Sequence, residues 1–364
     1  MCCSAASFRG SGRRDLAGDL AAWDSADVTE GVLRNRIRKE RVLSGMRPTG
    51  RLHLGHLLGA LENWRRLQDE YECYFFVADW HALTSDYADT SHLKEYIREV
   101  VLDWLSGGID PERAVLFVQS RLPEHAELHL LLSMITPLPW LERNPTYKEQ
   151  LQEVTNRDLS TFGFLGYPVL QAADILIYQA NFVPVGVDQL PHIELAREIA
   201  RRFNHLYKRV FTIPEAMLTE FPKIPGTDGR KMSKSYDNCI YLSDPPETVE
   251  KKIKPMVTDP ARIRRTDPGN PDVCPVYDLH KIFTPKAERE SYVVPGCRTA
   301  AIGCLDCKGV LLTHMLPVLT PIYERRVALA ERVGQIEDIL AAGTERARKV
   351  ARETLHAAKD AMGI

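Results

Sequence analysis

The chain has 364 residues, of which 44% are apolar, 26% charged and 8% aromatic, values ordinary for a globular protein of about two domains. No apolar run reaches the ~20 residues of a transmembrane helix, and the first twenty residues lack the apolar segment of a secretory signal, so we expect a cytoplasmic protein. The formal net charge of −2 excludes a basic field over the whole protein, so any contact with nucleic acid must come from local patches.

Residues 1–40 begin Gly- and Arg-rich and show only weak periodicity, which predicts a poorly ordered N-terminal extension. From residue 41 onward, short apolar runs alternate with helical patterns, as in parallel βαβ units. We therefore predict a doubly wound, Rossmann-like α/β domain over residues 41–236. Its predicted strands are Val42–Met46, Tyr74–Ala78, Ala114–Val118 and Phe182–Val185, and its predicted helices are His56–Asp69, Leu93–Ser106 and His192–Phe203.

After residue 237 the strand-like runs disappear. Helical patterns dominate over Pro246–Met256 and from Leu311 to Met362, with Pro- and Gly-rich loops between them. The change in pattern predicts a second, mainly helical domain over residues 237–364.

The first informative motif, His53-Leu-Gly55-His56, follows a predicted strand and opens a predicted helix. A helix N-terminus offers unpaired N–H groups and the positive end of a dipole, which suits phosphate. Gly55 lets a nucleotide approach the backbone closely, and the two imidazoles can donate hydrogen bonds to phosphate oxygens. The alternative is an ordinary strand–helix turn with surface histidines.

The second motif, Lys231-Met-Ser-Lys-Ser235, lies in a Gly- and Pro-rich stretch that begins at Ile224 and is predicted to form a mobile loop. Two lysines three residues apart, with a hydroxyl between them, are suited to grip a triphosphate. Taken alone, the motif is more typical of a solvated basic loop.

Together the two motifs resemble the paired signature of class I aminoacyl-tRNA synthetases, and the chain has neither a P-loop nor a dinucleotide-binding motif. The resemblance implies that an amino acid carboxylate attacks the α-phosphate of ATP, giving an aminoacyl adenylate and pyrophosphate, before transfer to tRNA. Because the carboxylate is already an anion, catalysis is positioning and charge stabilisation. His53 and His56 would contact the phosphates. Lys231 and Lys234, with Mg²⁺, would stabilise the pyrophosphate on a loop that closes.

Residues 165–176 predict the amino acid pocket, because Tyr167, Gln171 and Asp174 interrupt an otherwise apolar helix. Gln171 and Asp174 are three apart and share a helix face. A buried acceptor there can bond an indole N–H or a phenol O–H and would reject phenylalanine. The alternative is a helix with one satisfied core polar group.

The predicted strand over 182–185 is followed by Gly186, Asp188 and Gln189, which stand where a parallel sheet binds ligands and where ribose and ammonium groups could be held. The alternative is a strand–helix turn with a capping aspartate.

Residues 45–50, 167–176 and 183–195 resemble bacterial tryptophanyl-tRNA synthetases, and the similarity runs from about residue 41 to the C-terminus. The resemblance implies that Asp174 accepts the indole N–H, that Tyr167 and Gln189 hold the amino group, and that Gln171, where many bacterial members carry Met, shares the indole contact. Val187 stands where Glu is common, which argues against a side-chain role. The implied ATP site comprises Arg47, Pro48, Thr49, Gly55, His56, Gly186, Val187, Asp188, Ile224, Lys231, Met232, Ser233, Lys234 and Ser235.

Four cysteines cluster in the helical region: Cys274, Cys297, Cys304 and Cys307, with 22, 6 and 2 residues between them. Four thiolates suit either a tetrahedral Zn²⁺ or a [4Fe–4S] cluster. The spacing resembles that of a subset of tryptophanyl-tRNA synthetases with a [4Fe–4S] cluster near the anticodon-binding region. The resemblance thus favours a cluster that braces a loop without redox chemistry, and zinc is the alternative.

The same resemblance implies that residues 237–364 bind the anticodon, that the partners are tRNA(Trp), L-tryptophan and ATP, and that the protein is a homodimer. A tyrosyl-tRNA synthetase shares this fold and is the nearest alternative. A small-molecule nucleotidyltransferase would share the histidine motif but not the lysine motif. A synthetase-like RNA-binding regulator is disfavoured by the intact histidines and lysines.

Overall fold

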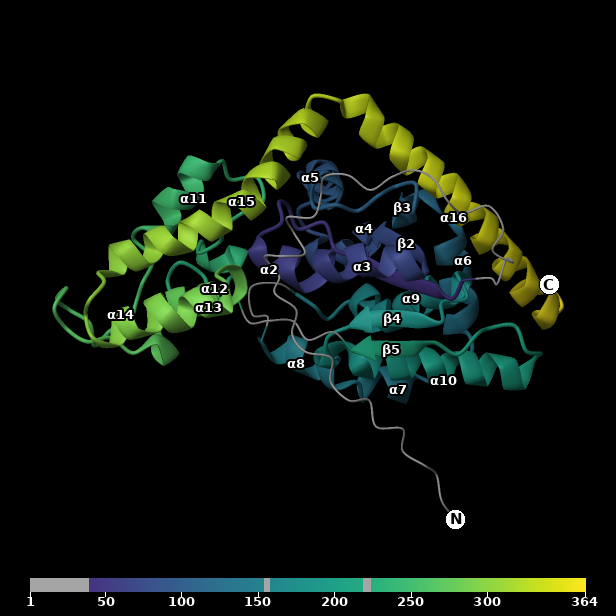
Figure 1. The fold of residues 1–364 in the computed structure, drawn as a ribbon. Helices are drawn as coiled ribbons and strands as arrows, with labels where there is room; N and C mark the ends of the chain where they lie inside the picture. The colour runs from purple at the N-terminus through teal and green to yellow at the C-terminus, as the bar shows by residue number, and fades with distance from the viewer. Residues whose placement is uncertain (1–38, 154–157, 219–223) are drawn as a thin grey trace, which may run out of the picture. The chain divides into compact units, whose positions relative to one another are not determined.

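A computed structural model describes residues 39–153, 158–218 and 224–364 (Figure 1). The N-terminal extension predicted over 1–40 lies outside the described residues, apart from its last two positions. Within the described ranges, each helix is too short or too polar to serve as a membrane span.

The core of the fold is a five-stranded parallel sheet in the order β3-β2-β1-β4-β5. Strand order reverses beside β1, so the crevice at the carboxyl ends of β1 and β4 is the switch point at which doubly wound sheets bind ligands. The predicted fold class is confirmed. The strands are β1 (Arg41–Met46), β2 (Glu72–Val77), β3 (Ala114–Val118), β4 (Phe182–Val185) and β5 (Glu215–Leu218).

The four predicted strands agree with β1 to β4 within two residues at each end, because their continuous apolar runs are buried between helices. The sequence did not predict β5. This edge strand has only three apolar residues and is partly exposed along its length, so its pairing with β4 is what makes it a strand.

Helices connect the strands and cover the sheet. The predicted helix His56–Asp69 is interrupted, because a π-helical turn over Leu57–Leu61 separates α2 from α3. Single π-helical turns of this kind are frequent at functional sites. The helices up to residue 206 are α2 (Leu54–His56), α3 (Glu62–Glu70), α4 (Asp79–Asp86), α5 (Leu93–Ser106), α6 (Glu124–Ser133), α7 (Leu138–Glu142), α8 (Pro145–Glu153), α9 (Phe162–Ile177) and α10 (Leu190–Leu206).

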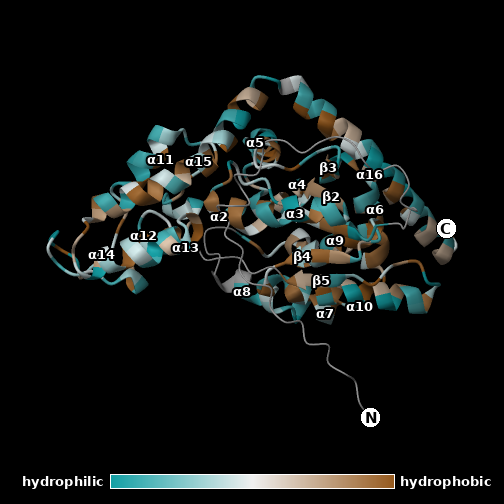
Figure 2. Cartoon of the chain, in the orientation of Figure 1, coloured by the Kyte–Doolittle hydropathy of each residue, from teal (hydrophilic) through white to brown (hydrophobic). Residues whose placement is uncertain are grey.

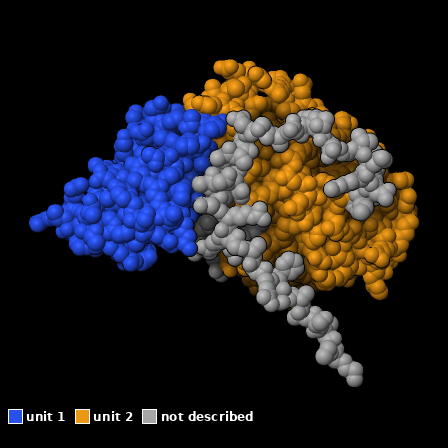
Figure 3. Space-filling view, in the orientation of Figure 1, with its two compact units in different colours: residues 1–33, 223–240, 244–321 blue, residues 34–222, 241–243, 322–364 orange. Residues whose placement is uncertain are grey.

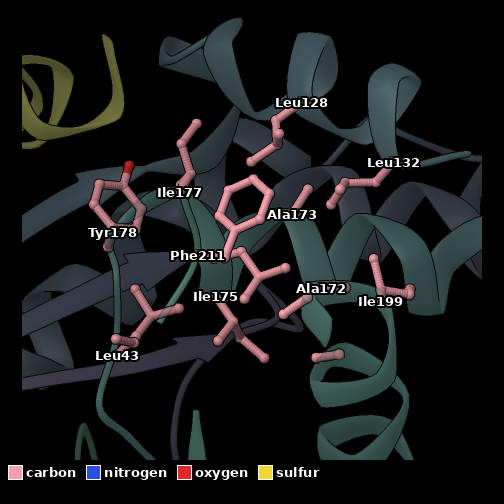
Figure 4. Close-up of a cluster of buried hydrophobic side chains, with 14 of the residues drawn as sticks. Leu43, Leu128, Leu132, Ala172, Ala173, Ile175, Ile177, Tyr178, Ile199 and Phe211 are labelled. Carbon is pink, nitrogen blue, oxygen red and sulfur yellow. The ribbon is translucent and has the colours of Figure 1, made fainter. Parts of the chain in front are cut away.

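Helix α9 packs against both α6 and α10 in the main hydrophobic core (Figure 4). Its Ala172 and Ala173 are fully buried and let the neighbouring helices approach closely. In Figure 4, Ala173 lies beside Leu132 of α6, and Ala172 lies beside Ile199 of α10. This packing fixes α9, the helix that carries the predicted amino acid pocket.

The remaining helices are α11 (Pro246–Ile253), α12 (Pro275–Phe283), α13 (Lys286–Glu288), α14 (Val294–Arg298), α15 (Cys304–Ala330) and α16 (Val333–Met362). The described residues form two compact units (Figure 3). The helical unit comprises 224–240 and 244–321. The sheet unit comprises the described residues up to 218, with 241–243 and 322–364.

These boundaries differ from the predicted 41–236 and 237–364, because α16 returns to the sheet unit and packs on β3. Hydrophobic and hydrophilic bands alternate along α16 (Figure 2), and its Ala347 and Ala351 are fully buried. Gly343 makes the close approach possible, since a Cβ there would lie 1.8 Å from the carbonyl oxygen of Leu116 in β3.

Candidate active site

The two histidines of the first motif lie on the turn between β1 and the following helices, where His53 is the N-cap of α2 and His56 is its last residue. His53 caps the helix: its Nδ1 accepts a hydrogen bond from the Gly55 N–H at 3.0 Å. The Nδ1 of His56 accepts from the His53 N–H at 3.3 Å. A ring nitrogen that accepts carries no proton, so each neutral imidazole holds its proton at Nε2 and can donate from there. A Cβ at position 55 would lie 2.8 Å from the His53 ring, so this turn requires glycine.

The residue before this turn is anchored on both sides of its backbone. The buried carboxylate of Asp103, on α5, accepts the Leu52 N–H at 2.6 Å. The Leu52 carbonyl accepts the N–H of Leu242 at 3.0 Å. Arg326 donates from Nε to the second Asp103 oxygen at 2.6 Å. Burial raises the pKa of Asp103 to about 6, although Arg326 opposes this shift. Asp103 and Arg326 lie far from the motif along the chain, so no local pattern predicts their contact with this turn.

The predicted pocket residue Asp174 is only 1% exposed, and its carboxylate accepts hydrogen bonds from three side chains. Gln119 donates to both oxygens, at 2.8 and 2.9 Å. His125 Nδ1 lies 2.7 Å from Oδ1, and His81 Nε2 lies 2.8 Å from Oδ2. Burial alone raises the pKa of Asp174, but the hydrogen bonds from His125 and His81 lower it to about 2. The carboxylate is therefore ionised at neutral pH, with its acceptor positions filled.

Sequence reasoning missed the three partners of Asp174. Gln119 directly follows β3, and His81 follows β2 by four residues, so both stand at the carboxyl edge of the sheet. Polar residues just after predicted strands were the signal that could have identified them. His125 lies on α6 and its Nε2 is 2.7 Å from the Tyr178 hydroxyl, which extends the buried network.

Tyr167 lies two turns before Asp174 on α9, and half-buried Gln171 lies between them. The Tyr167 hydroxyl is 2.7 Å from Nε2 of His192, and the ring of His81 lies 6.5 Å from the Tyr167 ring. Burial lowers the pKa of His192 to about 4 and raises that of Tyr167 to about 12. Both side chains are therefore neutral at pH 7. His192 lies within residues 183–195, which resemble tryptophanyl-tRNA synthetases, but its contact with Tyr167 was not predicted.

The predicted residues after β4 stand at the carboxyl edge of that strand. Gly186 is buried, and a 3₁₀ turn over Val187–Gln189 leads into α10. Gln189 Nε2 donates to the Asp188 carboxylate at 2.9 Å. The Val187 side chain is 70% exposed. On the other side of the switch point, Arg47 follows β1 and pairs with Asp86 at 2.8 Å, while the Thr49 N–H donates to the Arg47 carbonyl at 3.0 Å.

The lysine motif belongs to the helical unit, where buried Asn238 organises the loop that carries it. Asn238 Oδ1 accepts the Ser233 N–H at 2.8 Å, and its Nδ2 donates to Asp228 at 2.7 Å and to the Lys231 carbonyl at 3.2 Å. A Cβ at Gly226 would lie 2.2 Å from the Asn238 amide nitrogen. The segment predicted as a mobile loop thus has a defined internal fold.

Two predicted ATP-site residues brace this loop from inside. Met232 and Ile224 are both buried, and the Met232 N–H donates to the Ile224 carbonyl at 2.9 Å. A 3₁₀ turn over Lys234–Tyr236 carries Lys234 and Ser235 and ends at Asp237, which has a positive φ of 50°. The hydrogen bond at Met232 and the 3₁₀ turn therefore fix the backbone from which the side chains of Lys231 and Lys234 extend.

The four predicted cysteine ligands also lie in the helical unit, at Cys274 before α12, Cys297 in α14, and Cys304 and Cys307 in the first turn of α15. Burial and the three neighbouring thiols raise the pKa of Cys307 to about 12. His280 Nε2 lies 3.2 Å from the Cys307 sulfur. Over the described ranges, no three His, Cys, Asp or Glu side chains are arranged as ligands of a metal ion, so the predicted ligation is not observed.

Comparison with known proteins agrees with this geometry. Residues 35–316 match the family model described as tRNA synthetases class I (W and Y). The chain is 57% identical to the tryptophan–tRNA ligase of Thermotoga maritima, an alignment that covers 89% of this chain and 99% of that protein. It is 47% identical to the tryptophan–tRNA ligase of Aquifex aeolicus, covering 89% and 100%.

A solved structure gives the same picture. The crystal structure of tryptophanyl-tRNA synthetase from Campylobacter jejuni complexed with ADP and tryptophan superimposes with a TM-score of 0.81 at 34% identity, covering 89% of this chain and all of that one. The tyrosyl-tRNA synthetase of Archaeoglobus fulgidus, at 23% identity and a TM-score of 0.60, shares the fold. The chain therefore belongs to the class I tRNA synthetases of the tryptophan and tyrosine family and, within it, to the tryptophan–tRNA ligases.

Proposed function

We propose that the protein is a cytoplasmic enzyme that activates L-tryptophan with ATP, releasing pyrophosphate, and transfers tryptophan from the adenylate to tRNA(Trp). The relatives named above support this activity. The observation that carries it within the molecule is the buried, ionised Asp174, because a buried anionic acceptor selects an aromatic ligand with a polar hydrogen.

The indole N–H bonds Oδ2 of Asp174 and takes the place of the His81 donor. Of the three side chains that fill the carboxylate, His81 is the outermost, at 12% exposure, whereas His125 and Gln119 are fully buried. Displacing His81 therefore needs less rearrangement than displacing the other two. Gln171, one turn before Asp174 on the same face, shares the indole contact.

Tyr167 and Gln189 hold the ammonium group of the substrate. His192 is neutral at pH 7 and can accept the Tyr167 O–H, which leaves the phenol oxygen facing the ligand as an acceptor. Gln189 stands at the carboxyl edge of β4 beside Asp188, so amide and carboxylate oxygens are available at the switch point.

ATP binds across the same edge. His53 and His56 donate from Nε2 to its phosphate oxygens, and Lys231 and Lys234 stabilise the departing pyrophosphate together with Mg²⁺, which supplies charge neutralisation when bound. The remaining residues of the ATP site are Arg47, Pro48, Thr49, Gly55, Gly186, Val187, Asp188, Ile224, Met232, Ser233 and Ser235.

Amino-acid-dependent exchange of pyrophosphate into ATP tests this function. A panel of the twenty amino acids should show exchange with tryptophan and at least 10³-fold less with tyrosine and phenylalanine, since neither fills an indole site. Tyrosine-dependent exchange would instead identify a tyrosine enzyme. If no amino acid supports exchange, the protein is not an amino-acid-activating enzyme, and the alternative of a synthetase-like RNA-binding regulator is favoured.

Substituting Asn238 tests the loop that carries the lysines. In Asn238→Asp a carboxylate replaces the amide donor and faces Asp228 and the Lys231 carbonyl, so the loop loses its internal order. We expect the rate constant for tryptophan activation to fall about 10- to 100-fold, because misplaced catalytic groups cost this much. Calorimetric tryptophan affinity should not change.

The double variant Asn238→Asp with Asp228→Asn supplies the control, because it restores a donor opposite an acceptor. Its activation rate should recover in part. Equal rates for the wild type and Asn238→Asp would show that the loop does not depend on this amide.

We also propose that the four cysteines bind a [4Fe–4S] cluster, with Zn²⁺ as the alternative. The fit rests on the donor set, because four sulfurs lie in one loop region and the thiols of Cys274, Cys297 and Cys304 all act on Cys307. When bound, the metal centre would brace the loops between α12 and α15 and would leave the chemistry at ATP unchanged.

Anaerobic purification tests this proposal. We expect a broad visible absorbance band that is lost in Cys304→Ser, because one thiolate ligand is removed. The band should persist in Cys239→Ser, a buried cysteine outside the cluster and the matched control. A colourless protein that contains one zinc per chain would support the zinc alternative, and a metal-free protein would reject both.

Finally, we propose that the enzyme is a homodimer and that the helical unit binds the anticodon. Exposed apolar side chains of the sheet unit support the homodimer: Leu130 lies on α6, Met134 is the residue that caps the C-terminus of this helix, and Leu138 opens α7. Sedimentation equilibrium of the wild type and of Met134→Glu tests it, since a charge on this surface should dissociate the dimer.

A further inference from the structure

The turn that carries His53 and His56 depends on a buried ion pair that belongs to neither motif. Leu52, the residue before His53, is fully buried and cannot obtain a hydrogen bond for its N–H from water. Its N–H bonds Oδ2 of Asp103 at 2.6 Å. An unsatisfied buried N–H costs about 1–3 kcal/mol, so the backbone of this turn is held at the position of that carboxylate.

Asp103 is itself oriented by a cation from the far end of the chain. Arg326 donates from Nε to Oδ1 of Asp103 at 2.6 Å and also pairs with Glu99, one turn earlier on α5. The two Asp103 oxygens therefore have separate tasks: one holds Arg326 and the other holds the Leu52 N–H. Removing either donor leaves the buried carboxylate with only one partner, which is strongly unfavourable.

The end of α15 is fixed to α5 by two further contacts, so the ion pair is part of a rigid junction within the sheet unit. Arg325 donates from two nitrogens to the Ser106 carbonyl at 3.0 and 2.8 Å. Arg98 donates to the Ala330 carbonyl at 2.9 Å and thus satisfies the C-terminus of α15. The Asp103–Arg326 pair also reaches the histidine turn, through the Leu52 N–H.

We propose that Asp103 and Arg326 are positioning residues for adenylate formation: they fix the Leu52 backbone and thereby the placement of the two histidines against ATP. This inference rests on the proposed function, in which those histidines contact the phosphates. It also gives the last turns of α15 a part in catalysis. The first turn of this helix carries Cys304 and Cys307.

The test is the variant Asp103→Asn. An asparagine can accept from Leu52 or from Arg326 but not from both, because its second group is a donor. We expect deuterium uptake at the amides of residues 52–56 to rise at least tenfold. We expect the rate constant for tryptophan activation, normalised to titrated active sites, to fall about 10- to 100-fold. Tryptophan affinity by calorimetry should change less than twofold. Arg326→Gln should reproduce these effects, and the double variant should add nothing further.

Arg98→Gln is the matched control, because it weakens the same pair of helices without touching Asp103 or Leu52. It should change neither the uptake at 52–56 nor the activation rate. The inference is overturned if Asp103→Asn leaves both readouts at wild-type values. It is also overturned if Arg98→Gln lowers the rate equally, because the ion pair would then act only by packing α15 against α5. Failure of the proposed function is distinguishable, since the wild type would then show no exchange while deuterium uptake still reports on the pair.

Discussion

Replacing Asp174 with asparagine is expected to lower kcat/KM for tryptophan by a factor on the order of 10³ or more. The carboxylate accepts hydrogen bonds from Gln119, His125 and His81. An amide accepts at one position only, and its NH₂ group would face donors. The variant therefore loses both the anionic acceptor for the indole and the order of the side chains around it.

A ligand pair separates this recognition from general damage to the pocket. Benzothienylalanine has the shape of tryptophan but carries sulfur in place of the indole N–H. The wild type should prefer tryptophan over this analogue by at least 10²-fold, and Asp174→Asn should use both at similar, low rates. If the variant retained the wild-type preference, Asp174 could not be the indole acceptor. Calorimetric binding of ATP alone provides the check that the variant is folded.

The same substitution carries a pH signature. Hydrogen bonds hold the pKa of Asp174 at about 2 in the folded protein, below its ordinary value of 3.8. A carboxyl group with a depressed pKa adds to the free energy of unfolding above about pH 4, and this contribution is lost as the pH falls towards 2. For Asp174 the contribution is about 2 kcal/mol. Urea unfolding should therefore show Asp174→Asn destabilised at pH 7, with the difference shrinking below pH 4. A constant difference across this range would contradict the assignment.

The sequence could predict whatever depends on local pattern. The central strands are continuous apolar runs because helices cover both of their faces, so β1 to β4 were visible as such. The histidine motif was predicted to follow a strand and to open a helix, and it does lie between β1 and α2. The edge strand β5 was not visible, because its pairing partner rather than its own composition stabilises it.

The rest of the site depends on residues brought together from distant parts of the chain. The partners of Asp174 come from α4, α6 and the end of β3, and nothing in their local pattern marks them as one network. Asp103 and Arg326 are 223 residues apart. Likewise, the return of α16 to the sheet depends on Gly343, whose importance appears only against the Leu116 carbonyl. Tertiary contacts, not propensities, decide these features.

Lys231→Met and Lys234→Met are each expected to lower the rate constant for tryptophan activation by about 10²- to 10³-fold, equivalent to about 3–4 kcal/mol of transition-state stabilisation. Negative charge accumulates on the leaving pyrophosphate as the carboxylate attacks. Asn238 accepts the N–H of Ser233, which stands between the two lysines in the sequence, and so orders the backbone that carries both of them. Methionine keeps the length of the lysine stem and removes only the charge.

Single-turnover measurement of adenylate formation is the appropriate assay, because steady-state charging can be limited by product release. Lys251→Met is the matched control: this lysine lies on α11 of the same unit and is solvent-exposed. Tryptophan affinity should be equal in all three variants, since the residues proposed to bind tryptophan belong to the sheet unit. Rates for Lys231→Met and Lys234→Met no lower than that of Lys251→Met would contradict the proposed role. If only Lys231→Met and Lys234→Met lose activity, the positive charges of these two lysines stabilise the leaving pyrophosphate, because the methionine side chain keeps the loop fold and tryptophan binding unchanged.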